Sequence, residues 1–184
     1  MKKMKILMIP LFAAFMICGI LTSVNALTID PNTTPNWTGT ENNVPDILTT
    51  ITGIMGFSAA DNELYKKDVA PAVEYGPFKD SYSTVFDTNL EDATITWDGG
   101  NYINGSPLYV LVKDGKHQPA WYLFSINWNG KETIYLQDFW KEPTQGDISH
   151  VALYGKSVVP EPTTMLLLGL GLVGLAGVGR KFKK

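Results

Sequence analysis

The chain has 184 residues, of which 45% are hydrophobic, 18 are acidic and 15 are basic. Seven of the basic residues lie within five residues of either end, so residues 27–159 hold eight basic and 17 acidic side chains, a net charge of −9. Such an acidic stretch is a poor partner for nucleic acid or for an anionic membrane surface. The single cysteine, Cys18, lies near the N-terminus, so residues 27–159 cannot form a disulfide and depend on a hydrophobic core, for which one domain suffices.

The N-terminus has the three parts of a secretory signal peptide. Met1–Lys5 is basic, Ile6–Leu21 is apolar, and Val24 and Ala26 supply the small side chains of a cleavage site. We predict that residues 1–26 are a signal peptide, which signal peptidase removes by cutting after Ala26. An N-terminal anchor helix is the alternative, and the cleavage site that follows the apolar run disfavours it.

Residues 27–43 are a mixture of Thr, Asn and Pro with few apolar side chains. Such a composition buries little surface and favours turns. We therefore expect a disordered, exposed leader between the signal peptide and the folded domain.

The stretch that follows the leader predicts one or two short helices. Asn43 is suited to an N-cap and Gly56 to a stop. The apolar positions between them have helical spacing: Ile47, Ile51, Ile54 and Met55. A second capping pattern, Ser58 followed by Asp61, predicts another short helix that runs into residues 62–67. We expect both to pack over one end or face of a sheet.

From residue 81 onward the chain predicts β-structure. Six segments are rich in Val, Ile, Thr and aromatic residues and are separated by turn signals such as Asp114-Gly115. They are Ser81–Phe86, Thr94–Asp98, Leu108–Lys113, Ala120–Asn127, Glu132–Gln137 and Ile148–Tyr154. Residues 108–112 are apolar on both faces, which indicates a central strand. Short strands at this spacing predict a mainly β fold, an antiparallel β-sandwich over residues 44–155.

Few side chains in residues 27–159 are suited to catalysis. They include no cysteine, and of the two histidines His117 follows a turn, where we expect it to be solvated. Ser149 and His150 are neighbours in a predicted strand, where consecutive side chains point to opposite faces, so they cannot form a dyad. We therefore predict that the protein is not an enzyme. The alternative is a small secreted glycan-active hydrolase, which needs two carboxylates about 5–10 Å apart, and the sequence nominates no pair.

Two acidic turns are candidates for calcium, which proteins bind through oxygen ligands. One is Asp98–Asn101, and the other combines Asp87, Glu91 and Asp92. Neither has the spacing of an EF-hand, and turn chemistry or a solvated face explains each. We expect no cofactor, with calcium as the open alternative.

Five tryptophans are candidates for stacking on sugar rings. Trp97 and Trp121 lie in predicted strands, where we expect them to join the core. Trp128 and Trp140 lie in a turn and a loop, and we predict that their rings are exposed and bind glycan, with exopolysaccharide as the partner.

The C-terminal part of the chain has three segments. Residues 156–164 are a linker that contains Pro160, Glu161 and Pro162, where the prolines favour an extended backbone. Residues 165–179 carry no charge and five glycines, and are shorter than the roughly 20 residues of a stable spanning helix. We predict a transmembrane sorting helix that enters the inner membrane transiently. Residues 180–184 carry four cations, which favour the cytoplasmic side.

This order and spacing resembles the PEP-CTERM sorting signal of Gram-negative bacteria. In that family an exosortase, a membrane cysteine protease, processes the tail near the tripeptide, and the cargo is released to the cell surface or to the exopolysaccharide matrix. The resemblance covers residues 159–184 and implies a route rather than an activity. It implies a secreted cell-surface or extracellular-matrix protein, which we expect to be structural, adhesive or exopolysaccharide-binding in a biofilm.

Overall fold

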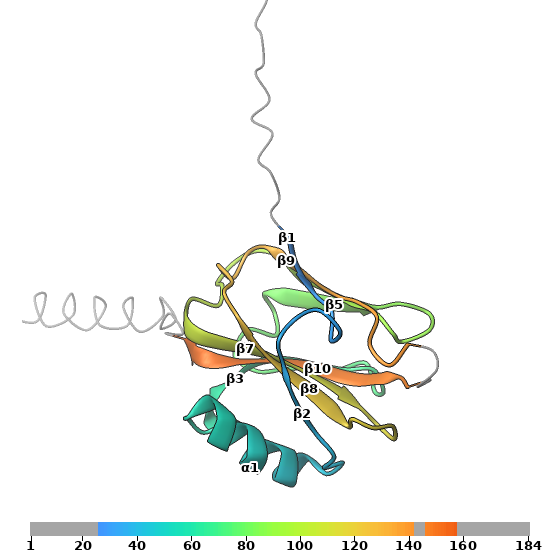
Figure 1. Ribbon diagram of the computed structural model, residues 1–184. Coiled ribbons are helices and arrows are strands. Elements are labelled where there is room, and N and C mark those ends of the chain that lie inside the picture. Colours follow the sequence, from blue (N-terminus) through green and yellow to red (C-terminus); the bar gives the residue numbers. More distant parts are fainter. Residues whose placement is uncertain (1–25, 142–145, 158–184) are drawn as a thin grey trace, which may run out of the picture.

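Two β-sheets lie face to face in the computed structural model, which describes residues 26–141 and 146–157 (Figure 1). The four-stranded sheet contains, in spatial order, β1 (Ala26–Ile29), β9 (Thr133–Leu136), β6 (Ala93–Trp97) and β5 (Tyr82–Phe86). The six-stranded sheet contains β2 (Trp37–Gly39), β8 (Trp121–Ile126), β7 (Gly105–Asp114), β10 (Ile148–Ser157), β3 (Glu63–Asp68) and β4 (Glu74–Tyr75). The mainly β fold is confirmed, and each predicted strand overlaps an observed one. The first sheet is mixed rather than antiparallel, because β1 runs parallel to β9.

Apolar side chains that alternate along the strands fill the space between the sheets. In the six-stranded sheet β7 contributes Val110 and Val112 to this core, and the four-stranded sheet contributes Ile95 and Ile134. The other side of β7 is apolar too, and its Leu111 is buried in a second cluster. β7 lies between β8 and β10, so the central position predicted from its two apolar faces is confirmed.

One helix, α1 (Val44–Met55), covers the outer face of the six-stranded sheet (Figure 1). It begins at its N-cap Asn43, whose side-chain oxygen accepts from the N–H of Asp46 at 2.9 Å. It ends at Gly56, which has a left-handed φ of 74° and donates its N–H to the carbonyl of Thr52. The buried stripe packs on the sheet as the periodicity predicts, through Ile47, Ile51 and Met55.

The prediction of a second helix that runs into residues 62–67 is wrong. The capping hydrogen bond is present, since Ser58 Oγ accepts from the N–H of Asp61, yet it starts only a single 3₁₀ turn, Ala60–Asn62. The next residues form β3, which pairs with β10 and buries Leu64 and Tyr65. Pairing with a distant strand overrides the local capping signal, which a short turn alone cannot extend.

The prediction of a disordered leader over residues 27–43 is also wrong. The segment begins with β1, in which Leu27 and Ile29 face the core on either side of Thr28, and Ile29 is fully buried. It continues into β2, an edge strand that pairs with β8. The average Thr and Asn content of the segment predicted disorder, but two short runs within it form strands, β1 and β2, by pairing with β9 and β8.

The remaining boundary predictions fall mostly outside the described residues. Residues 1–25 of the predicted signal peptide, the predicted linker from residue 158 on with Pro160, Glu161 and Pro162, the predicted transmembrane helix and the basic end all lie there. Within the described ranges, no helix is long and apolar enough to cross a membrane. The strand β10 continues to Ser157, two residues beyond the predicted domain end.

Candidate functional site

Trp128 and Trp140, the predicted glycan-binding side chains, are buried in the core between the sheets. Only 7% of Trp128 and 2% of Trp140 is exposed. Each indole N–H has a backbone partner at 2.7 Å, the carbonyl of Glu132 for Trp128 and that of Pro119 for Trp140. A tryptophan in a loop can be buried when its one polar atom is satisfied in this way. The prediction that these two rings are exposed is therefore wrong.

The other tryptophans divide between core and surface. Trp121 is fully buried beneath α1, as expected for its strand. Trp97 is only partly buried at the edge of the main core, where Lys131 Nζ lies 5.0 Å from the ring centroid. Trp37 on the edge strand β2 is 44% exposed, and the sequence did not single it out as a binding residue.

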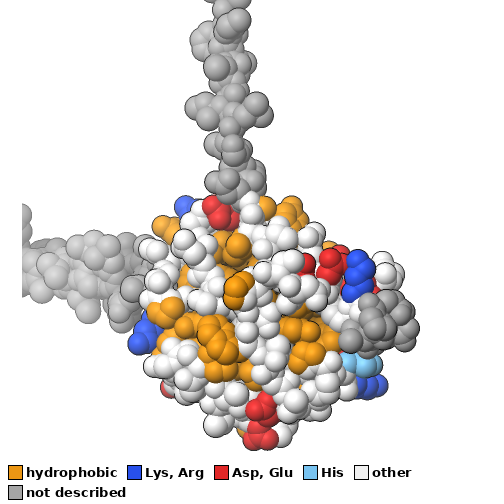
Figure 2. Space-filling model, viewed as in Figure 1, with side chains coloured by type: hydrophobic (Ala, Val, Ile, Leu, Met, Phe, Trp, Pro, Cys, Tyr) orange, Lys and Arg blue, Asp and Glu red, His pale blue; other side chains and the backbone are white. Residues whose placement is uncertain are grey.

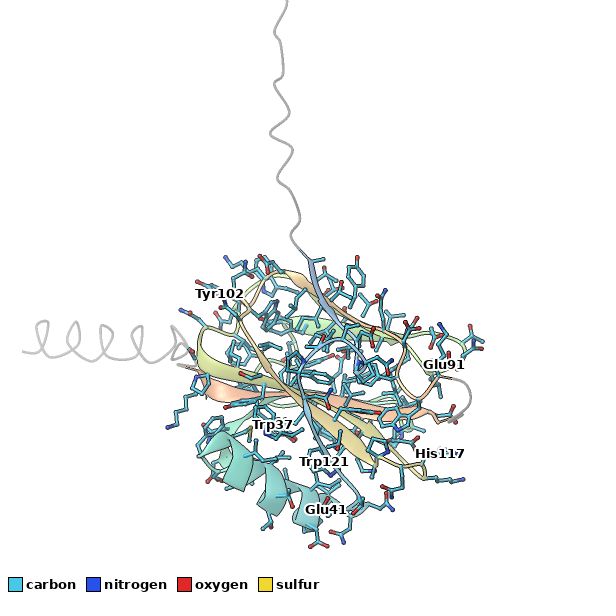
Figure 3. All side chains as sticks on the ribbon, in the orientation of Figure 1. Trp37, Glu41, Glu91, Tyr102, His117 and Trp121 are labelled. Atoms are coloured by element: carbon cyan, nitrogen blue, oxygen red, sulfur yellow. The ribbon has the colours of Figure 1, made fainter. Side chains whose placement is uncertain are left out.

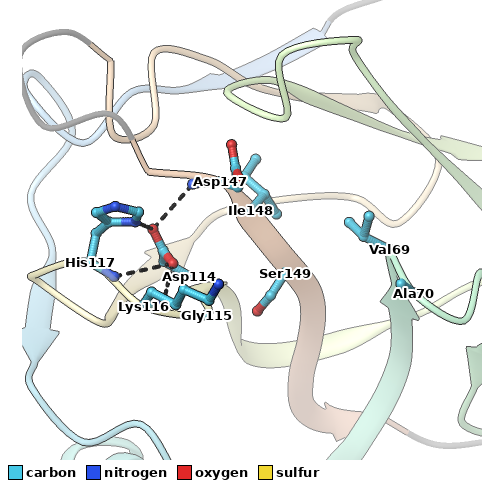
Figure 4. Close-up of a pocket in the computed structure, with 9 residues that line it drawn as sticks. All are labelled: Val69, Ala70, Asp114, Gly115, Lys116, His117, Asp147, Ile148 and Ser149. Atoms are coloured by element: carbon cyan, nitrogen blue, oxygen red, sulfur yellow. Dashed lines mark hydrogen bonds and ion pairs between the residues drawn. The ribbon is translucent and has the colours of Figure 1, made fainter.

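A pocket of about 230 Å³ lies where the β7–β8 hairpin meets the start of β10 and the end of β3 (Figure 4). Its lining combines apolar and polar groups: Val69, Ala70, Asp114, Gly115, Lys116, His117, Asp147, Ile148 and Ser149. The chemistry of this pocket depends on which of its polar groups are still available to a ligand.

The Asp114 carboxylate in this pocket is only 1% exposed and is fully engaged (Figure 4). It accepts from the backbone N–H groups of Lys116, His117 and Asp147, and its Oδ2 lies 3.0 Å from His117 Nδ1. The carboxylate thus ties the hairpin to the start of β10. His117 is hydrogen-bonded rather than simply solvated, a pairing that the Asp-x-x-His spacing across a tight turn would have indicated.

The remaining polar groups do not assemble a catalytic set around this pair. Ser149 donates its hydroxyl to the carbonyl of Lys113 at 3.0 Å. The neighbouring His150 is buried; burial, with help from Lys66 and Lys113, lowers its pKa to about 3. Asp68 Oδ1 lies 3.9 Å from His150 Nδ1. What the structure shows for Asp114 is that its buried carboxylate joins three backbone N–H groups of the hairpin and of the start of β10.

In the two candidate calcium turns, three carboxylates accept hydrogen bonds from groups of the protein itself. Asp87 Oδ1 accepts from the N–H groups of Glu91 and Asp92, and Asp92 Oδ1 accepts from the N–H of Asp138. Asp98 Oδ1 accepts from the hydroxyl of Ser83. Among residues 26–141 and 146–157, no three His, Cys, Asp or Glu side chains are grouped so that they could hold a metal ion.

The outer face of the four-stranded sheet is an open surface with an unusual composition. Its seven strand residues beyond the predicted cleavage site, which we call the hydroxyl face, are Thr28, Ser83, Val85, Thr94, Thr96, Thr133 and Tyr135. None is buried or charged, and six carry a hydroxyl group. One row crosses all four strands through register pairs: Thr28 with Tyr135, Tyr135 with Thr94, and Thr94 with Val85. Tyr135, 40% exposed, lies inside this row.

A family model described as the PEP-CTERM protein-sorting motif matches residues 158–181. The chain carries a PEP-CTERM sorting motif. The motif indicates export by way of the inner membrane, processing by exosortase and a final location at the cell surface or outside the cell. No curated protein and no solved structure matches the chain.

The PEP-CTERM motif begins directly after the last strand. β10 ends at Ser157, and its pairs with β7 and β3 all involve residues 148–157. Removal of the chain beyond residue 157 therefore leaves every described strand pair in place.

Proposed function

We propose that the processed protein is a non-enzymatic matrix component that binds exopolysaccharide through the hydroxyl face. The PEP-CTERM motif supports an exosortase-dependent surface protein, and the resemblance to that family implies release to the cell surface or to the exopolysaccharide matrix. The observation that carries the proposal is the composition of this open sheet face, with an exposed tyrosine ring surrounded by hydroxyl groups.

The arrangement of the face suits a sugar chain. Adjacent strands are about 4.8 Å apart, so the row of four residues that contains Tyr135 spans about 14 Å. Thr28 and Thr94 flank the Tyr135 ring on the neighbouring strands. A ring that is apolar on its face and polar at its hydroxyl, beside further hydroxyl groups, matches a sugar that has both C–H and O–H groups.

The absence of charged strand residues on the hydroxyl face favours a neutral glycan over a charged polymer. Residues 27–159 carry a net charge of −9, yet the seven strand residues of the hydroxyl face carry none. A neutral polymer avoids the repulsion that an anionic ligand meets on this domain, and it avoids the desolvation cost of any charged ligand.

The test is co-sedimentation of the processed protein with exopolysaccharide from the producing bacterium. Tyr135→Ala should weaken binding about tenfold or more, because truncating an aromatic residue in the centre of an interface often costs 1.4 kcal/mol or more. Thr94→Val, which removes one hydroxyl at constant shape, should weaken it several-fold. Tyr75→Ala is the matched control, because Tyr75 is 41% exposed but lies on β4 of the other sheet.

Two results would contradict this proposal. If wild-type protein fails to sediment with the polysaccharide, or if Tyr135→Ala binds as well as Tyr75→Ala, the hydroxyl face is not the site. Release of new reducing ends from the polysaccharide would instead favour the hydrolase alternative, for which a carboxylate pair would then have to be found.

A further inference from the structure

A second exposed aromatic group lies on the other side of the sandwich. Trp37, Tyr109, Phe57 and Lys156, which we call the tail-side patch, contact one another in that order. The ring centroids are 6.4 Å apart for Trp37 and Tyr109 and 6.0 Å for Tyr109 and Phe57, and Lys156 Nζ is 5.5 Å from the Phe57 centroid. Figure 2 shows apolar side chains gathered on this part of the surface, and Figure 3 labels Trp37 there.

The patch lies where the chain leaves the domain. Lys156 is the penultimate residue of β10, and Phe57 directly follows Gly56, the C-cap of α1. Trp37, at 44% exposed, is the most exposed aromatic residue of the patch, while Phe57 is partly exposed and Tyr109 nearly buried. An exposed tryptophan and a lysine thus flank the exit toward the sorting motif.

The distance to a membrane follows from the length of the next segment. Seven residues, 158–164, separate Ser157 from the uncharged run 165–179. Seven residues span at most about 24 Å when fully extended. If the uncharged run enters a bilayer, the exit of the domain is held within that distance of the lipid surface.

We propose that, in the precursor before processing, the tail-side patch rests on the lipid surface that residues 165–179 enter. Tryptophan favours the membrane–water interface, where the ring is in an apolar environment and the polar atom is hydrated, and lysine extends its charge toward head groups. The inference rests on membrane entry of residues 165–179 and is independent of the hydroxyl face.

Tethering makes a weak contact of this kind sufficient. The net charge of −9 opposes adsorption of the free domain, but a short linker keeps the patch at a high effective concentration near the lipid. Across the sheet, Tyr109 pairs with Tyr154, whose hydroxyl donates to the Glu63 carboxylate. The Glu63 carboxylate is therefore hydrogen-bonded within the domain and only partly exposed. After processing the tether is lost and the acidic domain leaves the surface.

The test uses the full precursor, produced in cells without exosortase and reconstituted in vesicles of phosphatidylcholine and phosphatidylethanolamine. Flotation first measures how much protein the vesicles hold. Brominated acyl chains then quench any tryptophan that reaches the interface. We expect quenching in the wild type, loss of at least half of it in Trp37→Phe, and weaker quenching in Lys156→Glu. Both side chains are exposed, so the variants should keep the wild-type circular dichroism spectrum.

Lys116→Glu is the matched charge control, because Lys116 is also exposed but lies in the β7–β8 hairpin, beside His117 at the far end of the domain (Figure 3). Equal quenching in wild type and Trp37→Phe overturns the inference. So does an equal effect of Lys116→Glu and Lys156→Glu, or precursor that does not float with the vesicles. Shielding of Trp37 in the absence of lipid would show that a protein segment, not lipid, covers the patch.

Discussion

Replacing Trp140 with alanine distinguishes a core residue from a ligand-binding one. In the structure the indole is 2% exposed and contacts the Tyr122 ring edge-on, with centroids 5.1 Å apart. Removing a buried tryptophan typically costs 3–5 kcal/mol. The carbonyl of Pro119 also loses its donor, which adds about 0.5–1.5 kcal/mol. We therefore expect a loss of at least about 3.5 kcal/mol, a large part of the 5–15 kcal/mol that stabilises a typical domain.

Urea unfolding of the processed protein, followed by far-ultraviolet circular dichroism, measures this loss. With a slope of about 2 kcal/mol per molar urea, the midpoint should fall by about 2 M. Trp140→Phe keeps most of the packing, so its urea midpoint should fall by less than half as much. This variant provides a second measurement if the alanine variant does not fold. A midpoint within 0.5 M of wild type for Trp140→Ala would refute a core role. Tyr135→Ala is the comparison for an exposed residue, and it should change the free energy of unfolding by less than about 0.5 kcal/mol.

Two further substitutions test the buried polar groups. Asp114→Ala leaves three backbone N–H donors without their acceptor. In thermal unfolding, the variant should lose about 3 kcal/mol of the free energy of unfolding. A loss below about 1 kcal/mol would mean that water replaces the carboxylate. His150 has a pKa of about 3 in the fold and about 6.5 when unfolded, so the unfolded chain binds the proton first and stability falls as the pH drops below 6.5. At pH 4.5 the loss is on the order of 2–3 kcal/mol, and His150→Gln should lose correspondingly less between pH 6.5 and 4.5 than wild type. Parallel curves would contradict a buried, neutral imidazole.

The features that the sequence predicted well are those set by neighbouring residues. Asn43 and Gly56 define the helix ends through contacts within one turn, so the bounds of α1 follow from the local sequence. The apolar run around Val110 specifies a central strand whichever strands flank it. In both cases no distant part of the chain is needed to reach the answer.

The errors concern features that depend on distant partners. β1 is stable because Ile29 pairs with Leu136, more than 100 residues away, and nothing near Ile29 indicates this pairing. Likewise, the indole N–H of Trp140 is satisfied in the core by the carbonyl of Pro119, which lies just before β8. Loop position alone therefore predicted exposure where the fold supplies a partner. The hydroxyl face was missed for a related reason, because its row exists only once four separate strands are in register.

The positions of the hydroxyl face and the tail-side patch suggest an order of events. The hydroxyl face is the outer face of the four-stranded sheet, and the patch belongs to the outer face of the six-stranded sheet, on the opposite side of the core. A precursor that rests on lipid through Trp37 would therefore present Tyr135 away from the membrane. Glycan could then bind before the tail is cut, and cleavage would release a domain that is already attached to the matrix. If so, precursor held in vesicles should bind exopolysaccharide as well as processed protein does, whereas a precursor that binds only after removal of its tail would mean that the two surfaces are not independent.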